Sequence, residues 1–442
     1  MVTTAFVKIW GKVVGAVAWD EDEGLARFEY DPDFSRSGWE LAPLKMPVST
    51  GGVFMFPELR SFRGGEYDTF KGLPGLLADI LPDKYGNRLL NAWLARNGRP
   101  ENSMNPVEQL CFIGTRGMGA LEFEPATFMR NNRSFDIEIG DLVETAHKIL
   151  DQRRAFGTRL AENEKSAMMD ILKIGTSAGG ARPKAIITYN KESGKVKSGQ
   201  VEAPDGFEHW IIKLDGVSDE QFGATHGYGR VEMAYYGMAL NCGIDMMESR
   251  LLEESGRAHF MTRRFDRERS EQKHHIQTLC AMQHYDFNDV NSYSYEQLFQ
   301  TMRALRLPYP QAEQMFRRIV FNVLARNCDD HTKNFAFRLK EDQAWELAPA
   351  YDLCHAYRPD SPWVSRHALS INGKRDGITK DDFLSLAKSM NIKKASRLIT
   401  LIGEVVGQWG DYAEEAKVDP LLRDSIQDTL LKFGSFTGKE LI

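Results

Sequence analysis

Hydrophobic and polar positions alternate in several short segments of the first part of the chain. Alternation over strand lengths occurs at 5–10, 13–18, 24–30 and 121–123. Between the last two of these segments, apolar residues recur at helical spacing over 71–98, broken by a turn at 81–83. We therefore expect a small α/β subdomain over residues 1–125.

The pattern changes twice beyond residue 125. The stretch 129–135 is polar and rich in Asn and Arg, so it reads as a linker, and a helix begins near residue 140. Apolar runs predict further strands at 185–188, 209–214 and 259–262. From about residue 271 helical periodicity dominates. One apolar stripe there predicts core packing: Phe316, Ile319, Val320, Val323 and Leu324. The sequence thus predicts an α+β fold with a sheet-bearing lobe at 126–270 and a helical C-terminal lobe at 271–442.

The composition is that of an ordinary globular protein. Of the 442 residues, 42% are hydrophobic and 27% are charged, which allows two or three domains with cores of their own. The net charge of −6 argues against a protein that grips nucleic acid through its overall field, and leaves open a local basic patch or a basic partner. The five cysteines show no C-x-x-C spacing, so we expect a reduced chain without a disulfide framework or zinc ribbon.

No segment of the sequence indicates export or membrane insertion. Residues 1–10 lack a basic region followed by an apolar run, so we read no signal peptide. No stretch of about 18 uncharged apolar residues occurs that would span a bilayer. We therefore expect a cytoplasmic protein without membrane contact.

The residues with the clearest chemical meaning lie between 329 and 352. Asp329 is followed five residues later by Asn334 and, after what reads as a short β-hairpin, by Asp352. In protein kinases the first Asp accepts the proton of the attacking hydroxyl, and the Asn and the second Asp hold the Mg²⁺ ions on ATP. Chance supplies this spacing often, but the helix before it and the hairpin after it strengthen the signal. The pattern favours a phosphoryl-transfer site.

A glycine-rich segment lies upstream, in the order that a kinase requires. It runs from Gly175 to Lys184 and leads into the strand 185–188. Its glycines would let backbone N–H groups approach phosphate oxygens closely. The alternative reading is a flexible connection before a strand. No G-K-[ST] sequence occurs in the chain, so a P-loop NTPase is disfavoured.

Lys213 lies inside the apolar run 209–214. A lysine in such a run either extends its amine to solvent or neutralises an anion, and in a kinase-like lobe it would contact the ATP phosphates. We expect Glu232, on the next helix, as its ion-pair partner. The helix dipole explains a Glu at a helix N-terminus equally well.

Two other enzyme classes compete with a protein kinase. A set of carboxylates and imidazoles could ligate a catalytic metal in a hydrolase: Asp329, Asp330, His331, Asp352 and His355. Neither HExxH nor a cluster of three His ligands occurs, and the upstream lysine and glycine-rich segment would have no role, so we disfavour the hydrolase. A small-molecule kinase would share the same phosphate chemistry and differ only in its substrate groove.

In their order along the chain, these segments resemble the HipA family, the kinase toxins of bacterial type II toxin–antitoxin modules. The most recognisable N-terminal run is Phe70–Asp83 with Gly86-Asn87. The others are Ser177–Lys184, Ile212–Leu214, Arg264–Arg267, Asp329–Asn334, Ala348–Leu353 and Leu369–Lys374. The resemblance covers nearly the whole chain, and the ordered series is more specific than any one motif.

The resemblance implies a bilobal, protein-kinase-like fold with ATP and Mg²⁺ bound between the lobes. Asp329 would be the catalytic base, with Asn334 and Asp352 as the Mg²⁺ ligands. The nucleotide contacts that it implies are Ser177, Ala178, Gly179, Gly180, Lys184, Lys213, Thr262, Arg263, Phe265, His331 and Lys333. Ser177 would also be autophosphorylated. A phosphate there adds about −1.5 to −2 charges and should repel ATP, which makes the modification a self-inactivating switch.

The same resemblance implies partners. The usual partner in the family is a HipB-like helix-turn-helix antitoxin dimer, through which the chain would reach operator DNA. The implied substrate is a protein, with aminoacyl-tRNA synthetases as the candidate class. A non-catalytic corepressor that only binds the antitoxin is the main alternative. The role of residues 1–125 stays open between a docking surface and a structural brace.

Overall fold

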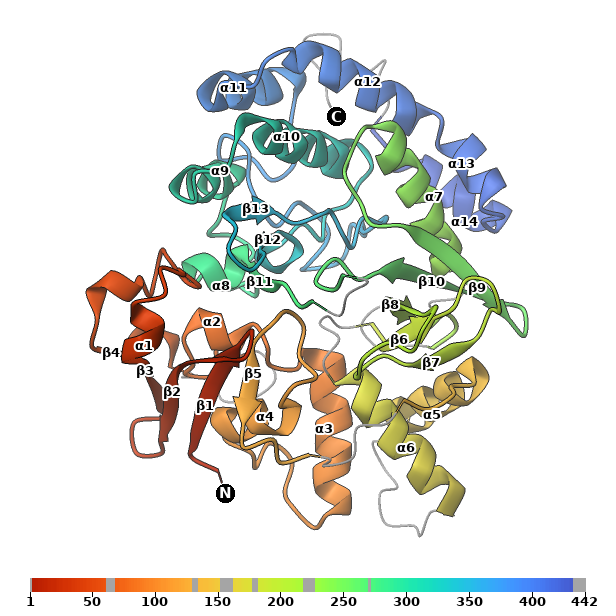
Figure 1. Ribbon diagram of the computed structural model, residues 1–442. Helices are drawn as coiled ribbons and strands as arrows, with labels where there is room; N and C mark the ends of the chain where they lie inside the picture. Colours follow the sequence, from red (N-terminus) through yellow and green to blue (C-terminus); the bar gives the residue numbers. More distant parts are fainter. Residues whose placement is uncertain are drawn as a thin grey trace. The chain divides into compact units, whose positions relative to one another are not determined.

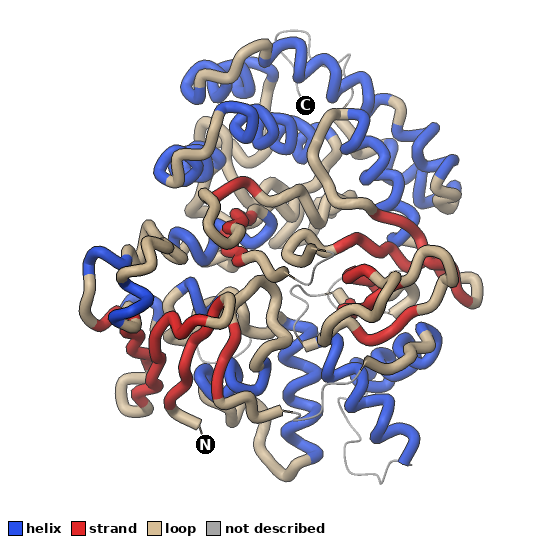
Figure 2. Tube along the Cα trace, in the orientation of Figure 1, coloured by secondary structure: helices blue, strands red, loops and turns tan. Residues whose placement is uncertain are grey.

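The structure is a computed structural model that describes residues 2–60, 68–128, 134–151, 162–176, 182–217, 227–268 and 272–431. The chain forms two compact units (Figure 1). The first unit comprises Met1–His226, Arg250–Gln277 and Leu339–Gln343. The second comprises Gly227–Ser249, Thr278–Arg338 and Ala344–Ile442. Strands gather in the first unit, whereas most of the second is helical (Figure 2).

The first unit begins with an antiparallel sheet in the order β4-β3-β2-β1-β5. Its strands are β1 (Thr4–Ile9), β2 (Lys12–Asp20), β3 (Leu25–Tyr30), β4 (Val53–Phe54) and β5 (Glu122–Glu124). The hairpin between β1 and β2 turns at Trp10 and Gly11, both with positive φ, which suits the twist of a two-residue turn. The predictions of strands at 5–10, 13–18, 24–30 and 121–123 are confirmed.

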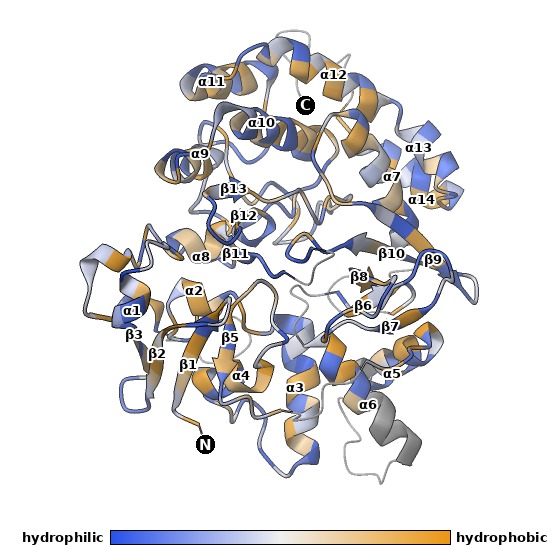
Figure 3. Ribbon diagram, viewed as in Figure 1, coloured by the Kyte–Doolittle hydropathy of each residue, from blue (hydrophilic) through white to orange (hydrophobic). Residues whose placement is uncertain are grey.

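Short helices complete this part of the first unit. They are α1 (Pro32–Ser35), η1 (Val48–Thr50), η2 (Pro57–Leu59), α2 (Gly75–Ala78), α3 (Lys84–Arg96) and α4 (Pro106–Ile113). Helix α4 packs against β1, β2 and β5, and the hydrophobic positions of β1, β5 and α4 are orange in Figure 3. The helical segment predicted at 71–98 is confirmed as α2 and α3. Helix α2 ends at Ala78 and α3 begins at Lys84, and Pro82 between them cannot donate a helical hydrogen bond.

A second antiparallel sheet follows in the order β7-β6-β8-β10-β9. Its strands are β6 (Lys184–Tyr189), β7 (Val196–Ser198), β8 (Glu208–Lys213), β9 (Ser249–Glu254) and β10 (Arg257–Arg263). Helices α5 (Ile139–Asp151) and α6 (Glu162–Gly175) precede it, and β11 (His275–Thr278) follows it. The three strands predicted in this part of the chain are confirmed as β6, β8 and β10. The domain boundaries at residues 125 and 270 stay predictions.

Helices dominate the second unit. They are α7 (Tyr228–Asn241), α8 (Leu279–Gln283), α9 (Tyr295–Ala304), α10 (Tyr309–Leu324), α11 (Lys380–Met390), α12 (Ala395–Gly407), α13 (Trp409–Glu415) and α14 (Pro420–Gln427). The predicted core stripe of α10 is confirmed, because all five of its residues are buried. The hairpin β12 (Ala336–Leu339) and β13 (Trp345–Leu347) follows α10 and the short η3 (Thr332–Asn334). Within the described residues, no helix is long and apolar enough to cross a membrane.

Candidate functional site

Asp329 lies on the loop that follows α10. The helix ends at Leu324, and Arg326 has a φ of +53°, which turns the chain out of the helical path. The Asp329 side chain is 45% exposed. The side-chain amide of Asn334 donates a hydrogen bond to the Asp329 carbonyl oxygen over 2.6 Å and so closes the loop. The predicted base and one predicted Mg²⁺ ligand therefore share one short, hydrogen-bonded loop.

Backbone and side-chain hydrogen bonds join this loop to the segment that carries Asp352. The Cys328 N–H donates to the carbonyl of Ala356, whose own N–H donates to Arg326, both over 3.0 Å. The Tyr351 hydroxyl donates to the Lys333 carbonyl over 2.6 Å. Tertiary structure thus brings the two acidic segments together, although Tyr351 and Lys333 are 18 positions apart in the chain.

Asp352 has a backbone conformation that is rare for a residue with a side chain. Its φ is +53°, in the left-handed region, which costs of order 1–3 kcal/mol for a residue other than glycine. Twelve other non-glycine residues of the described chain have a φ between +48° and +60°, and surrounding contacts must hold each of them in place. The bond from the neighbouring Tyr351 is one such restraint.

The donor set suits a hard cation that is shared with phosphates. Asn334 and Asp352 offer amide and carboxylate oxygens, and Mg²⁺ is usually held by one or two protein oxygens together with substrate phosphates and waters. Among the residues that the structure describes, no group of three or more His, Cys, Asp or Glu side chains forms a metal cage. These two residues therefore fit Mg²⁺ held jointly with a nucleotide better than a metal bound by protein alone.

Asp330, next to Asp329, is the centre of a buried polar network. Its side chain is fully buried and accepts hydrogen bonds from the Tyr295 hydroxyl, from Nδ1 of His367 over 2.9 Å and from the Ala368 N–H over 2.7 Å. Burial lowers the pKa of His367, but the Asp330 carboxylate outweighs it and raises that pKa to about 10. Asp330 and His367 therefore form a charged pair beneath the loop at neutral pH.

This network weighs against the hydrolase reading. Asp330 is fully occupied by its buried donors, and Nε2 of His355 lies 2.9 Å from the Thr429 hydroxyl. Burial lowers the pKa of His355 to about 4, with the Arg326 charge acting in the same direction. Two of the five candidate metal ligands thus serve other contacts. From the sequence, Asp330 was a candidate metal ligand only, and His367 was not predicted. The two residues are 37 positions apart, and no local pattern in the sequence links them.

Two predicted phosphate contacts of the first unit lie side by side. Lys184 of β6 is directly opposite Lys213 of β8 in the antiparallel register. Lys184 is buried, and the Lys213 amine lies 5.8 Å from the centre of the Phe260 ring. The predicted contacts Ser177, Ala178, Gly179 and Gly180 lie outside the described residues.

The predicted adenine-side residues are at the end of β10. Thr262 and Arg263 pair with Ile211 and Trp210 of β8, and the guanidinium Nη1 of Arg263 lies 3.4 Å from a carboxylate oxygen of Glu208. Phe265 follows the strand and is partly buried. The first unit therefore carries this segment and the lysine pair on adjacent strands of one sheet.

Three further predicted residues belong to the second unit. His331 packs against the Phe287 ring, and its Nε2 lies 3.7 Å from a carboxylate oxygen of Asp329. The Lys333 amine lies 4.7 Å from the centre of the same ring. Glu232 is buried in α7. Its pairing with Lys213 stays a prediction.

Comparison with known proteins adds family information to this geometry. A model of the HipA N-terminal domain matches residues 5–124, and a model of the HipA-like C-terminal domain matches residues 176–411. A search of curated proteins gives no match.

Two solved structures extend the comparison. One is of HipA in the Shewanella oneidensis MR-1 toxin–antitoxin system, in a complex with HipB and operator DNA. It matches with a TM-score of 0.66 and 17% sequence identity, and the match covers 97% of this chain and 100% of that one. It shows the fold and confirms the expected HipA-like α+β architecture. The other is the Helicobacter pylori proinflammatory kinase CtkA: TM-score 0.32, 12% identity, over 50% of this chain and 88% of that one. That similarity is too low to carry an argument.

Proposed function

Because the chain belongs to the HipA family, we propose that it is an ATP-dependent serine/threonine protein kinase and the toxin of a toxin–antitoxin module. The observation that carries this proposal is the pair of joined segments in the second unit. These segments carry Asp329, Asn334 and Asp352, the residue types that act as base and Mg²⁺ ligands in protein kinases, and hydrogen bonds join them.

The reaction is a displacement at phosphorus. The oxygen of a Ser or Thr hydroxyl bonds to the γ-phosphorus of ATP, the bond from that phosphorus to the β–γ bridging oxygen breaks, and ADP leaves. Asp329 accepts the hydroxyl proton, and the exposure of its side chain makes it accessible to a protein substrate. Mg²⁺, held by oxygens of Asn334 and Asp352, would neutralise phosphate charge.

The remaining predicted residues bind and orient the nucleotide. Lys184 and Lys213 would neutralise phosphate charge, and the strand register places them directly opposite each other. Thr262, Arg263 and Phe265 would lie beside the adenine. Ser177, Ala178, Gly179 and Gly180 would cover the phosphates, and Glu232 would pair with Lys213. His331 and Lys333 would contact the nucleotide from the catalytic loop.

The proposed partners follow from the same premise. The similar Shewanella oneidensis structure contains HipB and operator DNA. We therefore propose a HipB-like helix-turn-helix antitoxin as a partner, with operator DNA reached mainly through it. The net charge of −6 fits a chain that leaves DNA contact to a basic partner. Aminoacyl-tRNA synthetases are the proposed class of substrate.

Mass spectrometry after incubation with Mg-ATP tests the function. Protein first treated with a phosphatase should gain one phosphoryl group on Ser177, whereas Asp329→Asn should gain none. That result would establish the activity, the base and the modified residue together. Wild-type protein that gains no phosphate would contradict the kinase and favour the non-catalytic corepressor.

A further inference from the structure

One hydrophobic core joins the N-terminal subdomain to the sheet that carries the lysine pair. Helices α3, α4, α5 and α6 and strands β6, β8 and β10 all contribute to it, and its members include Tyr85, Leu89, Phe112, Ile171, Leu172, Ala185, Trp210, Ile212 and Met261. Protein cores are close-packed, so they transmit small displacements and do not absorb them. A shift of α3 would therefore reach the strands that carry Lys184 and Lys213.

Helix α3 approaches the main chain at Thr176, the residue before Ser177. A Cβ atom added at Gly86, near the start of α3, would lie 2.8 Å from the Thr176 carbonyl oxygen and 2.8 Å from Cβ of Pro82. A Cβ added at Gly175 would lie 2.7 Å from Cδ1 of Leu89. At Gly86 the close atom is a backbone oxygen, so only glycine permits that approach, whereas at Gly175 the end of the Leu89 side chain would have to move. The contact fixes the backbone where the glycine-rich segment begins.

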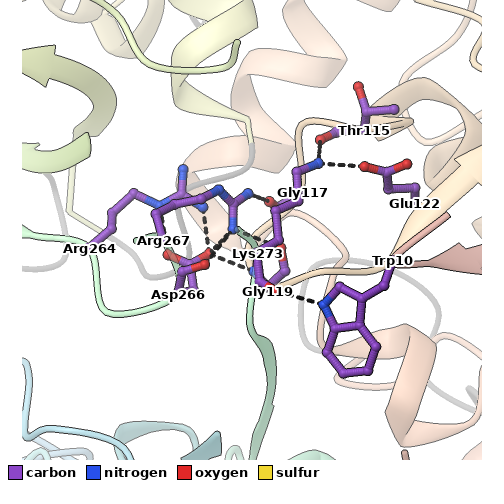
Figure 4. Close-up of polar contacts among 9 residues, drawn as sticks. All are labelled: Trp10, Thr115, Gly117, Gly119, Glu122, Arg264, Asp266, Arg267 and Lys273. Atoms are coloured by element: carbon purple, nitrogen blue, oxygen red, sulfur yellow. Dashed lines mark hydrogen bonds and ion pairs between the residues drawn. The ribbon is translucent and has the colours of Figure 1, made fainter. Parts of the chain in front are cut away.

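A second attachment lies just after β10, at Asp266 (Figure 4). Its fully buried carboxylate accepts two hydrogen bonds from Arg264, over 2.8 and 2.6 Å, one from Arg267 over 2.8 Å and one from the Gly119 N–H over 2.7 Å. Burial raises the pKa of Asp266, but the two guanidinium groups and this N–H outweigh it and hold the pKa well below its ordinary value. Arg267 also donates to the carbonyls of Gly117 and Gly119, over 3.2 and 2.9 Å.

Lys273 strengthens this second attachment (Figure 4). Its amine pairs with Glu122 over 2.6 Å and donates to the Thr115 carbonyl over 3.1 Å. The Trp10 indole N–H donates to the Lys273 carbonyl over 2.7 Å. The N-terminal subdomain is therefore tied to the segment that follows the adenine-side strand as well as to the segment that precedes β6.

We propose that the N-terminal subdomain sets the ATP affinity of the chain, with Gly86 and Asp266 as positioning residues. The two attachments bracket the proposed nucleotide-binding strands in the sequence, one before β6 and one after β10. The inference rests on the proposed function, because it assigns a positioning role to residues that touch neither nucleotide nor substrate. If the N-terminal subdomain were only a structural brace, weakening it would lower the stability of the protein and leave its affinity for ATP unchanged.

Gly86→Ala tests the first attachment. The new Cβ at 2.8 Å is about 0.6 Å inside ordinary contact, so α3 or the main chain at Thr176 must shift to accommodate it. We expect the Kd of a fluorescent, non-hydrolysable ATP analogue with Mg²⁺ to rise about tenfold. The KM for ATP should rise equally, while the transfer rate at saturating ATP stays within about twofold of wild type. Asp266→Asn, which removes the charge at the second attachment, should shift affinity in the same direction.

Two control variants separate positioning from stability. Gly410→Ala, near the start of α13, adds the same methyl group where no heavy atom lies within 4 Å, and should keep the wild-type Kd. Phe34→Leu weakens the stacking of Phe34 on Tyr30 in the same subdomain and should lower Tm while keeping the wild-type Kd. Neither residue belongs to an attachment.

The outcomes are distinct. A wild-type Kd in both Gly86→Ala and Asp266→Asn would overturn the inference, as would an equal rise of Kd in Phe34→Leu at the same loss of Tm. If wild-type protein binds the analogue but transfers no phosphate, the proposed kinase activity is wrong. The Kd values of the variants still test the positioning role in that case. Wild-type protein that binds no ATP analogue would overturn both.

Discussion

Asp330→Asn should destabilise the protein strongly, although the neighbouring Asp329→Asn should not. The Asp330 carboxylate is fully buried and pairs with His367 over 2.9 Å. With an ordinary His pKa of 6.5 and a folded-state pKa of about 10, the pair contributes about 4 kcal/mol to the free energy of unfolding at pH 7. The usual cost of breaking a buried pair, about 3–5 kcal/mol, agrees with this magnitude.

Calorimetry can measure this loss for the two variants. A loss of about 4 kcal/mol should lower the transition of the second unit by roughly 8–16 °C, at about 2–4 °C per kcal/mol. Two compact units need not unfold together, so the transitions are assigned separately. The Asp329 side chain is 45% exposed, so Asp329→Asn should change the free energy of unfolding by less than about 0.5 kcal/mol while it abolishes phosphoryl transfer.

The pH dependence gives a sharper test. The folded-state pKa of His367 is raised, so its stabilisation is fully present below pH 6.5 and is lost as the pH rises through about 10. Asp330→Asn removes this contribution, so the difference in unfolding free energy between wild type and variant should shrink as the pH rises from 6.5 to 10. A difference below about 1 kcal/mol at pH 7, or one that is constant over that range, would refute the reasoning.

Two further substitutions follow from the site. Asp352→Asn should lose more than about 10²-fold in transfer rate, because Mg²⁺ loses a charged ligand, while far-UV circular dichroism stays that of the wild type; near-normal turnover would rule out this ligand. Lys213→Met should remove most of the rise in Tm that Mg-ATP produces by binding the folded state. A wild-type ATP-induced shift in that variant would show that Lys213 does not contact phosphate.

Much of the secondary structure was predictable, because its signals are local. Alternation over a few residues marks β1, β2 and β3, and the apolar stripe at 316–324 marks α10, since each pattern is complete within one segment. Strand β7 was missed because its three residues, Val196–Ser198, are too few to show a period. Strand β9 was also missed, because no clear alternation of buried and exposed residues distinguishes Ser249–Glu254.

The order of the chemical groups was predictable from the sequence: a glycine-rich segment, a lysine in a strand, and then Asp329, Asn334 and Asp352. Which of these groups are neighbours depends on how the strands and loops pair in space. The register of β6 and β8 places Lys184 opposite Lys213, 29 positions apart in the chain. That register depends on strand pairing, which no local window of the sequence contains.

The pair Asp329 and Asp330 shows the same limit most clearly. Two identical side chains are adjacent in the sequence, yet one is 45% exposed and the other is fully buried. Asp330 is buried among donors that come from distant parts of the chain, the Tyr295 hydroxyl, the His367 ring and the Ala368 N–H. The sequence shows which residues can ionise. The fold determines which of them are buried beside an opposite charge, and the role of each carboxylate depends on that environment.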